Sequence, residues 1–410
     1  MHTGEIIRFY REKAGLTQSQ LGEGICTTTH VSKIERGKTA YSDDIISLFS
    51  ERLGIDIHHE ITTFHQVEKQ LQLWHNSIIM RRMNLVEQMK SELEKSPFLE
   101  SSKYGVYYHL LRARYYLLHN NDDLSSNILD SIHRGSSPLT AYETNLFLHV
   151  QGLIYIRDNT DENQQKALQV LKKIDMDTYK NEECYYHISI AYHCIGNKVM
   201  SYFYAGKALS FFKKTNNYTG AIKAETLMLL QLSSEMYLEF EDLVERYKSL
   251  IQDTDSLGYS DQKGALLNNL GYEYYNRKEY ALAKKCFKEA LNLAEKGSIP
   301  YLRRLCNFTD ACIEGNLANS KQIKKHIQHG LSESKSANST QFTTLFELFS
   351  LRMDNKSDDY FSYLENKALP YFFETKNVLL IERFGKVLYE YYVGSEKFKK
   401  AVQLSNQLMK

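Results

Sequence analysis

At 410 residues and 47.8 kDa, the chain is too long for one compact core, since single hydrophobic cores stop growing near about 250 to 300 residues. Its 51 Lys and Arg balance 50 Asp and Glu, so the chain as a whole is not strongly charged. Any nucleic-acid or acidic partner must therefore bind a locally charged surface. Only four prolines and 20 glycines argue against a β-sandwich or barrel, and predict an all-α protein of long helices and short loops.

Several function classes lack their sequence signals. The six cysteines stand in no Cys/His set with metal-ligand spacing, and there is neither a basic-then-apolar leader nor an apolar run of about 18 residues. We therefore expect a reduced, cytoplasmic protein with no membrane span and no cofactor. His58, His59 and His65 lack partners at ligand spacing, so we expect no metal site. Because nucleotide-binding, nucleophile-elbow and zinc-protease motifs are absent, we expect no enzyme activity.

Residues 1–60 predict a small module of four or five helices of about ten residues each. Thr17 and Gln20 fit a capping box at the start of the second helix. Thr27 fits the N-cap of a third helix that stops at Gly37. Two short helices with this separation are typical of a helix-turn-helix.

The third predicted helix has a polar face. Val31 and Ile34 define its inward side, so at about 100° per residue Thr29, Lys33 and Arg36 point away from the core, with Thr28 beside them. Hydroxyl and amino donors of this kind read base edges. The alternative is that these side chains are simply solvated.

The stretch LTQSQLGEGICTTTHVSKIERGKT resembles the helix-turn-helix of the phage-repressor and Xre family, with Gly22 where that pattern usually has alanine. The resemblance implies that Glu35 pairs inside the module with Arg8 or Arg11. It also implies two sets of DNA contacts: bases read by Thr28, Thr29 and Lys33, and phosphates held by Gln18, Thr27 and Arg36.

The charge of this module bears on assembly. Residues 1–60 hold seven Lys and Arg against nine Asp and Glu, a net charge of −2. One copy would bind DNA weakly, because neutralised phosphates supply most non-specific affinity. We therefore expect a homodimer or higher homo-oligomer on a pseudo-palindromic double-stranded operator.

Residues 61–105 are interpreted as a linker with leading helices, and the boundary is placed near residue 60 because residues 55–63 show no strong helix signal. From residue 106 to residue 410 we predict about eight tetratricopeptide-like helix pairs in a right-handed superhelix. The clearest copy runs from Leu270 to Ala290 with the spacing L-G-x2-Y-x8-A-x3-F-x2-A. The repeats are predicted to begin near residues 106, 145, 182, 224, 264, 302, 341 and 382.

A helix-turn-helix followed by such an array resembles the peptide-pheromone receptors of the RRNPP family, and its length is most like the NprR branch. The resemblance implies a transcription regulator whose repeat groove binds a short signalling peptide. Whether that peptide activates or releases DNA binding stays open. The alternative is an adaptor whose repeats bind and inhibit a signalling response regulator, as in the Rap relatives, with DNA binding secondary.

The groove side of each first helix supplies the candidate peptide site. Asn268, Asn269 and Asn307 are the predicted clamp, since an amide offers both a donor and an acceptor to a peptide backbone. Capping or solvation of these amides is the alternative. Arg114 and Arg157 could each hold a carboxylate, or could form surface ion pairs. The same face adds Tyr272, Tyr275 and Asn276.

Overall fold

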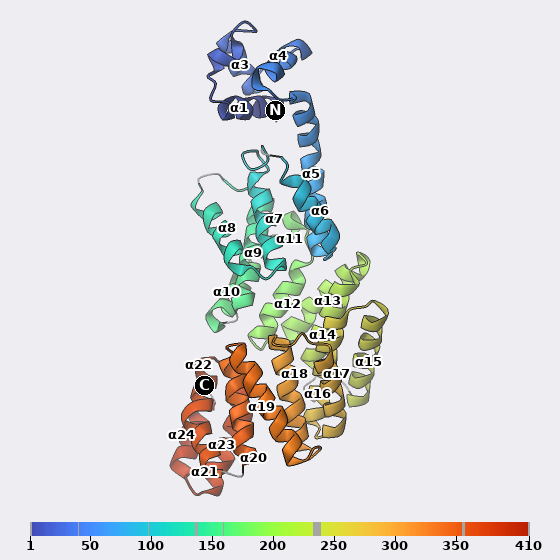
Figure 1. Ribbon diagram of the computed structural model, residues 1–410, viewed down its shortest axis with the longest axis vertical. Helices are drawn as coiled ribbons and strands as arrows, with labels where there is room; N and C mark the ends of the chain where they lie inside the picture. Colours follow the sequence, from blue (N-terminus) through green and yellow to red (C-terminus); the bar gives the residue numbers. More distant parts are fainter. Residues whose placement is uncertain are drawn as a thin grey trace. The chain divides into compact units, whose positions relative to one another are not determined.

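The computed structural model describes residues 2–39, 41–96, 98–135, 138–158, 160–232, 239–354 and 357–408. Every regular element in these ranges is a helix and none is a strand, which confirms the all-α prediction (Figure 1). Within the same ranges, no helix is long and apolar enough to cross a membrane. The chain divides into two compact units, unit 1 (residues 1–158 and 165–188) and unit 2 (residues 159–164 and 189–410), which are described separately.

The head of unit 1 is a small helical module with its own core. Its four helices are α1 (His2–Lys13), α2 (Gln18–Gly22), α3 (Thr28–Glu35) and α4 (Asp43–Leu53). Thr17 and Gln20 form the predicted capping box, and the Thr27 hydroxyl accepts from the His30 backbone N–H at 3.2 Å. Apolar side chains from each helix and from the next one form the core: Ile7, Leu21, Val31, Ile34, Ile46, Phe49 and Ile57.

Helix α5 (Ile57–Ile79) follows directly and begins within residues 55–63, where the sequence shows no strong helix signal. Asp56 caps this helix by accepting from the His59 backbone N–H at 2.9 Å. Although the start of this helix is mostly polar, the helix carries an apolar stripe with helical spacing. Its buried side chains are Ile57, Phe64, Val67, Leu71 and Trp74. Helix α6 (Met83–Leu93) packs against α5.

Eight helix pairs follow in the described part of the chain, as predicted. Each first helix begins within six residues of its predicted start, the largest difference being residue 218 against 224. The first helices are α7 (Gly105–Leu118), α9 (Ala141–Asp158), α12 (Cys184–Cys194), α14 (Tyr218–Leu232), α16 (Ser260–Asn276), α18 (Ile299–Glu314), α20 (Thr340–Met353) and α23 (Val378–Gly394).

The second helices vary more than the first. A short extra helix, α11 (Met176–Tyr179), lies before α12, and the seventh pair ends in a helix interrupted by a π-helical turn, α21 (Ser357–Tyr363), η1 (Leu364–Ala368) and α22 (Leu369–Glu374). The remaining second helices are α8 (Asp122–Arg134), α10 (Asp161–Leu171), α13 (Lys198–Lys214), α15 (Phe240–Ser256), α17 (Tyr280–Asn292), α19 (Ser320–Ser336) and α24 (Phe398–Leu408).

The pair α16/α17 shows why the repeat spacing matters. A Cβ atom at Gly271 would lie 2.6 Å from the Phe287 ring, so only glycine lets the two helices approach this closely. Ala283 and Ala290 are fully buried, and Phe287 is 1% exposed. Gly271 on α16 therefore faces the large ring of Phe287 on α17, and the small residues Ala283 and Ala290 lie on α17 on either side of that ring in the sequence.

Candidate functional site

The exposed face of α3 carries the predicted DNA-contacting residues. Thr27, Thr28, Thr29, Lys33 and Arg36 are all exposed. No residue in the described ranges forms an ion pair or side-chain hydrogen bond with Lys33 or Arg36. These donors are therefore available on one side of a helix whose other side is buried through Val31 and Ile34.

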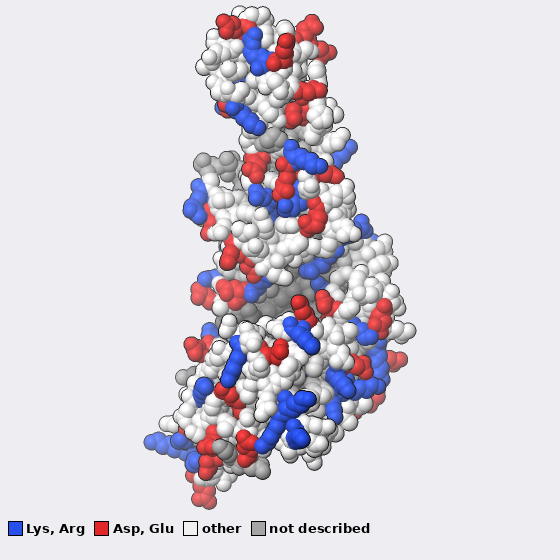
Figure 2. All heavy atoms as spheres, in the orientation of Figure 1, with Lys and Arg blue, Asp and Glu red and all other residues white. Residues whose placement is uncertain are grey.

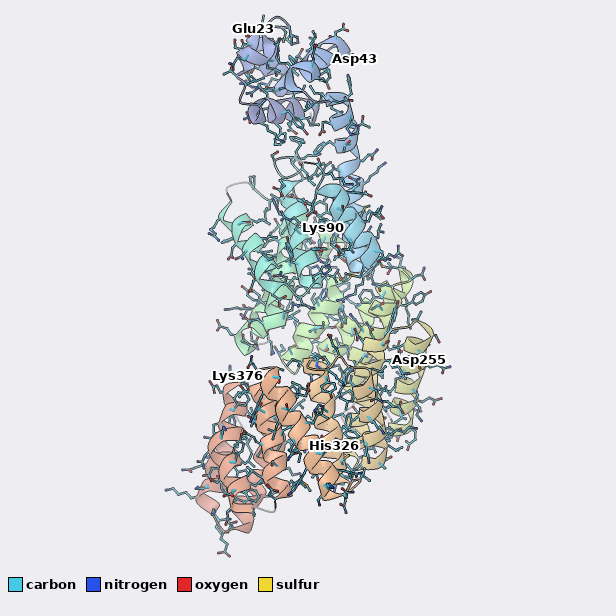
Figure 3. The ribbon with its side chains drawn as sticks, in the orientation of Figure 1. Glu23, Asp43, Lys90, Asp255, His326 and Lys376 are labelled. Atoms are coloured by element: carbon cyan, nitrogen blue, oxygen red, sulfur yellow. The ribbon has the colours of Figure 1, made fainter. Side chains whose placement is uncertain are left out.

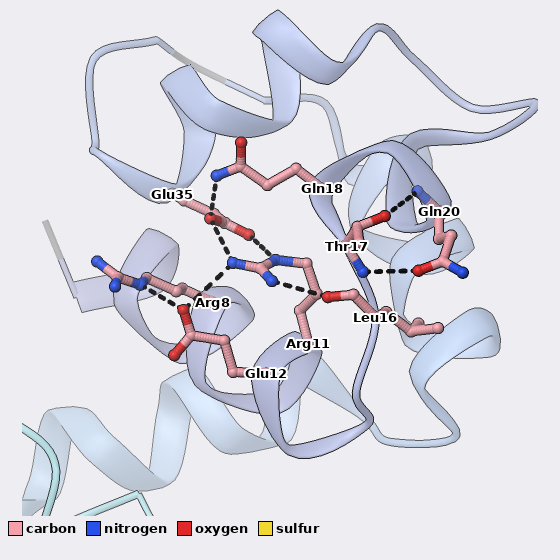
Figure 4. Close-up of polar contacts among 8 residues, drawn as sticks. All are labelled: Arg8, Arg11, Glu12, Leu16, Thr17, Gln18, Gln20 and Glu35. Carbon is pink, nitrogen blue, oxygen red and sulfur yellow. Dashed lines mark hydrogen bonds and ion pairs between the residues drawn. The ribbon is translucent and has the colours of Figure 1, made fainter.

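Gln18, the sixth predicted contact, is engaged within the protein. Arg11 Nε lies 2.5 Å from Glu35 Oε1 and Arg11 Nη2 lies 3.1 Å from Glu35 Oε2, while Gln18 Nε2 donates to Glu35 Oε2 at 2.7 Å (Figure 4). The family-implied pairing of Glu35 is thus made by Arg11, and Arg8 pairs with Glu12 instead. A phosphate contact by Gln18 stays a prediction, and it would compete with this buried pair.

The head exposes acidic side chains as well as basic ones. Glu23, after α2, and Asp43, at the start of α4, are exposed (Figure 3). Figure 2 shows acidic and basic side chains interspersed on the face that it draws. The α3 donors are therefore a local basic patch and not part of a broad positive surface.

In unit 2, two of the predicted clamp residues lie together. Asn307 on α18 donates from Nδ2 to Asn268 Oδ1 on α16 at 3.0 Å, and both side chains are half-buried. This bond leaves the Asn268 amide N–H groups and the Asn307 carbonyl oxygen for a further partner. Asn269 is half-buried beside Asn268, and Asn276 is exposed at the last residue of α16.

The predicted groove residues Tyr272 and Tyr275 lie beside a charged cluster that the sequence analysis did not predict. Tyr272 and Tyr275 stack with ring centroids 6.3 Å apart, and Arg383 Nη2 donates to the Tyr275 hydroxyl at 3.0 Å. Arg383 Nη1 lies 2.6 Å from Asp310 Oδ2. Burial lowers and Asp310 raises the pKa of Arg383, with a net upward shift that keeps it charged. The first helices α16, α18 and α23 therefore meet around Arg383.

A signal for these residues exists in the sequence. Counted from the predicted repeat starts, Asp310 and Glu314 of the sixth repeat are level with the predicted groove residues Tyr272 and Asn276 of the fifth. Arg303 and Arg383 each lie one residue after the predicted start of their repeat. A comparison of all repeats position by position would have indicated these charged residues.

The two arginines predicted to hold a peptide carboxylate are already paired within unit 1. Arg114 is 5% exposed and its Nη2 donates to Glu183 Oε2 at 2.7 Å. Arg157 Nε donates to Asp122 Oδ1 at 2.7 Å, at the surface. We therefore leave both out of the peptide site proposed below.

The buried surroundings of Arg114 include three histidines. His149 Nε2 and His187 Nδ1 lie 2.8 Å apart, and one ligand atom from each, with a Glu183 oxygen, lies within 4.8 Å of the others. A metal ion held there would sit beside the Arg114 guanidinium, whose charge Glu183 already neutralises. His149 Nδ1 is also engaged, 2.8 Å from the Tyr179 hydroxyl. We interpret these residues as a polar network whose groups contact one another.

His75 makes this network sensitive to acid. Its Nε2 lies 3.2 Å from Arg114 Nη1, and burial, followed by the Arg114 charge, lowers the pKa of His75 to about 3. The unfolded chain binds this proton near pH 6.5, so stability is present above pH 6.5 and is lost as the pH falls toward 3. We expect unit 1 to lose about 2 kcal/mol between pH 7.5 and 5 from His75 alone, at about 1.4 kcal/mol per pH unit.

Urea titration at the two pH values measures this loss through Trp74, the single tryptophan, which is fully buried in unit 1. Between these pH values, the free energy of unfolding of His75→Asn should depend on pH less steeply than that of the wild type, by about one proton bound on unfolding. An unchanged slope in His75→Asn would contradict the assignment.

Comparison with known proteins gives one matching family and two relatives. The helix-turn-helix family matches residues 7–59. The transcriptional activator NprA of Geobacillus stearothermophilus is 21% identical over 408 residues, which cover 95% of this chain and 99% of NprA. The response regulator aspartate phosphatase I of Bacillus subtilis (strain 168) is 20% identical over 368 residues, which cover 82% of this chain and 93% of the relative.

Solved structures share the fold. The apo form of the quorum sensor NprR from B. thuringiensis matches with a TM-score of 0.70 and 19% identity, over 84% of this chain and 98% of NprR. NprR in complex with its cognate peptide NprX matches with a TM-score of 0.66 and 20% identity, over 84% of this chain and 99% of that one.

Proposed function

We propose that this chain, a member of the RRNPP family and of its NprR branch, is a cytoplasmic transcription regulator that binds DNA through its head and is switched by a short signalling peptide in the groove of its helix pairs. One observation carries the proposal. The chain combines a segment that matches the helix-turn-helix family with eight helix pairs in its described residues, and 95% of it aligns with a transcriptional activator.

The α3 face supports DNA binding, and Lys33 is the residue on which it depends most. We expect Lys33→Ala to weaken binding of a specific duplex by about 1 to 3 kcal/mol, because a base contact made by its ammonium group is lost. The duplex is obtained by selection from a random-sequence pool with the full-length chain, and affinity is measured by fluorescence anisotropy.

Lys69→Ala is the matched control, since Lys69 is an exposed lysine on α5, outside the helix-turn-helix. Wild-type affinity in Lys33→Ala would remove Lys33 from the reading face. We also propose that the regulator is a homodimer or higher homo-oligomer, because the head carries a net charge of −2 (seven basic against nine acidic residues in 1–60). Selected duplexes should then contain two inverted half-sites.

The Asn268–Asn307 pair supports peptide binding. An extended peptide passing this pair could donate to the Asn307 carbonyl oxygen and accept from the Asn268 amide, whatever its side chains. We expect Asn268→Ala and Asn307→Ala each to weaken peptide binding by about 1 to 3 kcal/mol, or roughly five- to 150-fold, because peptide groups are left desolvated and unpaired. Calorimetric titration with a peptide selected from a synthetic heptapeptide library measures this loss.

Asn292→Ala, at an exposed asparagine on the second helix α17, is the control. Melting curves separate binding from folding. Unchanged affinity in both groove variants would move the peptide site elsewhere, and a collapsed melting temperature would make the two amides structural.

A second function is favoured by the alignment with the B. subtilis response regulator aspartate phosphatase I. The repeats would then bind a response regulator, with DNA binding secondary. We assign no catalysis to this chain, so the test measures binding: wild-type protein is titrated with response regulators. Binding of a response regulator, with no duplex recovered by selection, would favour this alternative.

A further inference from the structure

One face of α18 carries a charge that no other described residue of unit 2 opposes. Arg303, Asn307, Asp310 and Glu314 follow one another at spacings of four, three and four residues, so they share one side of the helix. Both acids are neutralised from other helices: Arg383 Nη1 lies 2.6 Å from Asp310 Oδ2, and Arg352 Nη1 lies 2.5 Å from Glu314 Oε1. Arg303 is the remaining charge on this face.

Arg303 has no partner among the residues that the structure describes. Its side chain is exposed, and no ion pair or hydrogen bond joins it to another described residue. The protein around it lowers the pKa of Arg303 by desolvation, and no neighbouring acid opposes that shift. Its charge is therefore accessible and uncompensated by any described residue, so an added anion can pair with it.

The adjacent arginine behaves differently. Arg304 is 7% exposed, and its Nη1 donates to the Ala290 backbone carbonyl at 2.8 Å, close against Gly264. That guanidinium helps to hold α16, α17 and α18 together. Of two consecutive arginines, one is built into the packing and the other is left available on the face that carries Asn307.

We propose that Arg303 binds a carboxylate of the signalling peptide, and that this carboxylate lies within about one helical turn of the backbone held by Asn268 and Asn307. The inference rests on the proposed function. A guanidinium suits this role because its planar donors match both carboxylate oxygens. The carboxylate comes from an Asp or Glu side chain or from the free C-terminus of the peptide.

The experiment begins with affinity selection from a synthetic random heptapeptide library with free C-termini, using the full-length chain. The best peptide is then compared with two analogues, one with each acidic side chain changed to its amide and one with a C-terminal amide. With wild-type protein, one analogue should bind about 10- to 100-fold more weakly. With Arg303→Gln, the acid and amide forms should bind alike, and Arg303→Lys should bind the acid form with intermediate affinity.

Arg246→Gln is the matched control, an exposed arginine on the second helix α15, and should behave as wild type. The role of Arg303 would be overturned if the amide analogue lost affinity equally for wild type and Arg303→Gln, or lost none for wild type. If peptide binding still depended on Asn307, the proposed function would hold without a role for Arg303. Recovery of no peptide by the wild-type chain would overturn both.

Discussion

Arg114→Met is expected to lower the free energy of unfolding of unit 1 by about 3 to 5 kcal/mol, because removing one partner leaves a buried charge uncompensated. Glu183 is 8% exposed, and its carboxylate accepts from Arg114 Nη2 at 2.7 Å. Burial raises and the Arg114 charge lowers the pKa of Glu183, with a net downward shift, so the carboxylate is ionised in the folded protein. Urea titration followed by Trp74 fluorescence measures the loss.

Arg157→Met provides the comparison, since Arg157 pairs with Asp122 at the surface, where the two side chains are 33% and 44% exposed. Exposed pairs contribute only about 0 to 1 kcal/mol, so this variant should unfold nearly as the wild type does. The double variant Arg114→Met with Glu183→Leu should recover much of the loss, because no charge is then left buried. A loss below about 1 kcal/mol in Arg114→Met would contradict a buried, ionised pair.

Glu35→Ala is expected to destabilise the head by about 3 to 5 kcal/mol for the same reason, applied to Arg11. Arg11 is 8% exposed and Glu35 is 6% exposed, and the same carboxylate also accepts from Gln18. The pair joins α1 to α3, so its loss loosens the support of the DNA-reading face. Hydrogen exchange read by mass spectrometry should show faster exchange in α1 to α3.

The head offers its own comparison pair. Arg8 and Glu12 lie 2.8 Å apart with side chains 62% and 51% exposed, so Arg8→Gln should leave exchange nearly unchanged. Equal protection in Glu35→Ala and in the wild type would mean that the pair does not hold α1 against α3.

Local patterns predicted the helix pairs, because the contacts that make a pair lie close in sequence. Gly271 meets Phe287 across one short turn, so their spacing is visible in the chain. The capping box at Thr17 is local in the same way. The start of α5 was missed because the polar residues after Asp56 dilute an apolar stripe that becomes clear only further along the helix.

Long-range pairs could not be predicted in this way. The Arg383–Tyr275 hydrogen bond joins residues 108 apart, and the Arg114–Glu183 bond joins residues 69 apart. Each depends on how successive helix pairs stack, which no spacing along the chain encodes. For the amide pair, the sequence indicated Asn268 and Asn307 as groove residues but did not predict that they bond to each other.

The central claim is that peptide bound in unit 2 changes DNA binding by the head. It is tested by the affinity of the full-length chain for its selected duplex, measured by fluorescence anisotropy with and without saturating selected heptapeptide. We expect the peptide to change this affinity at least about fivefold in either direction, which corresponds to a coupling free energy of about 1 kcal/mol. We expect the change to be lost at the same peptide concentration in Asn307→Ala. An affinity for DNA that is the same with and without bound peptide would contradict this claim.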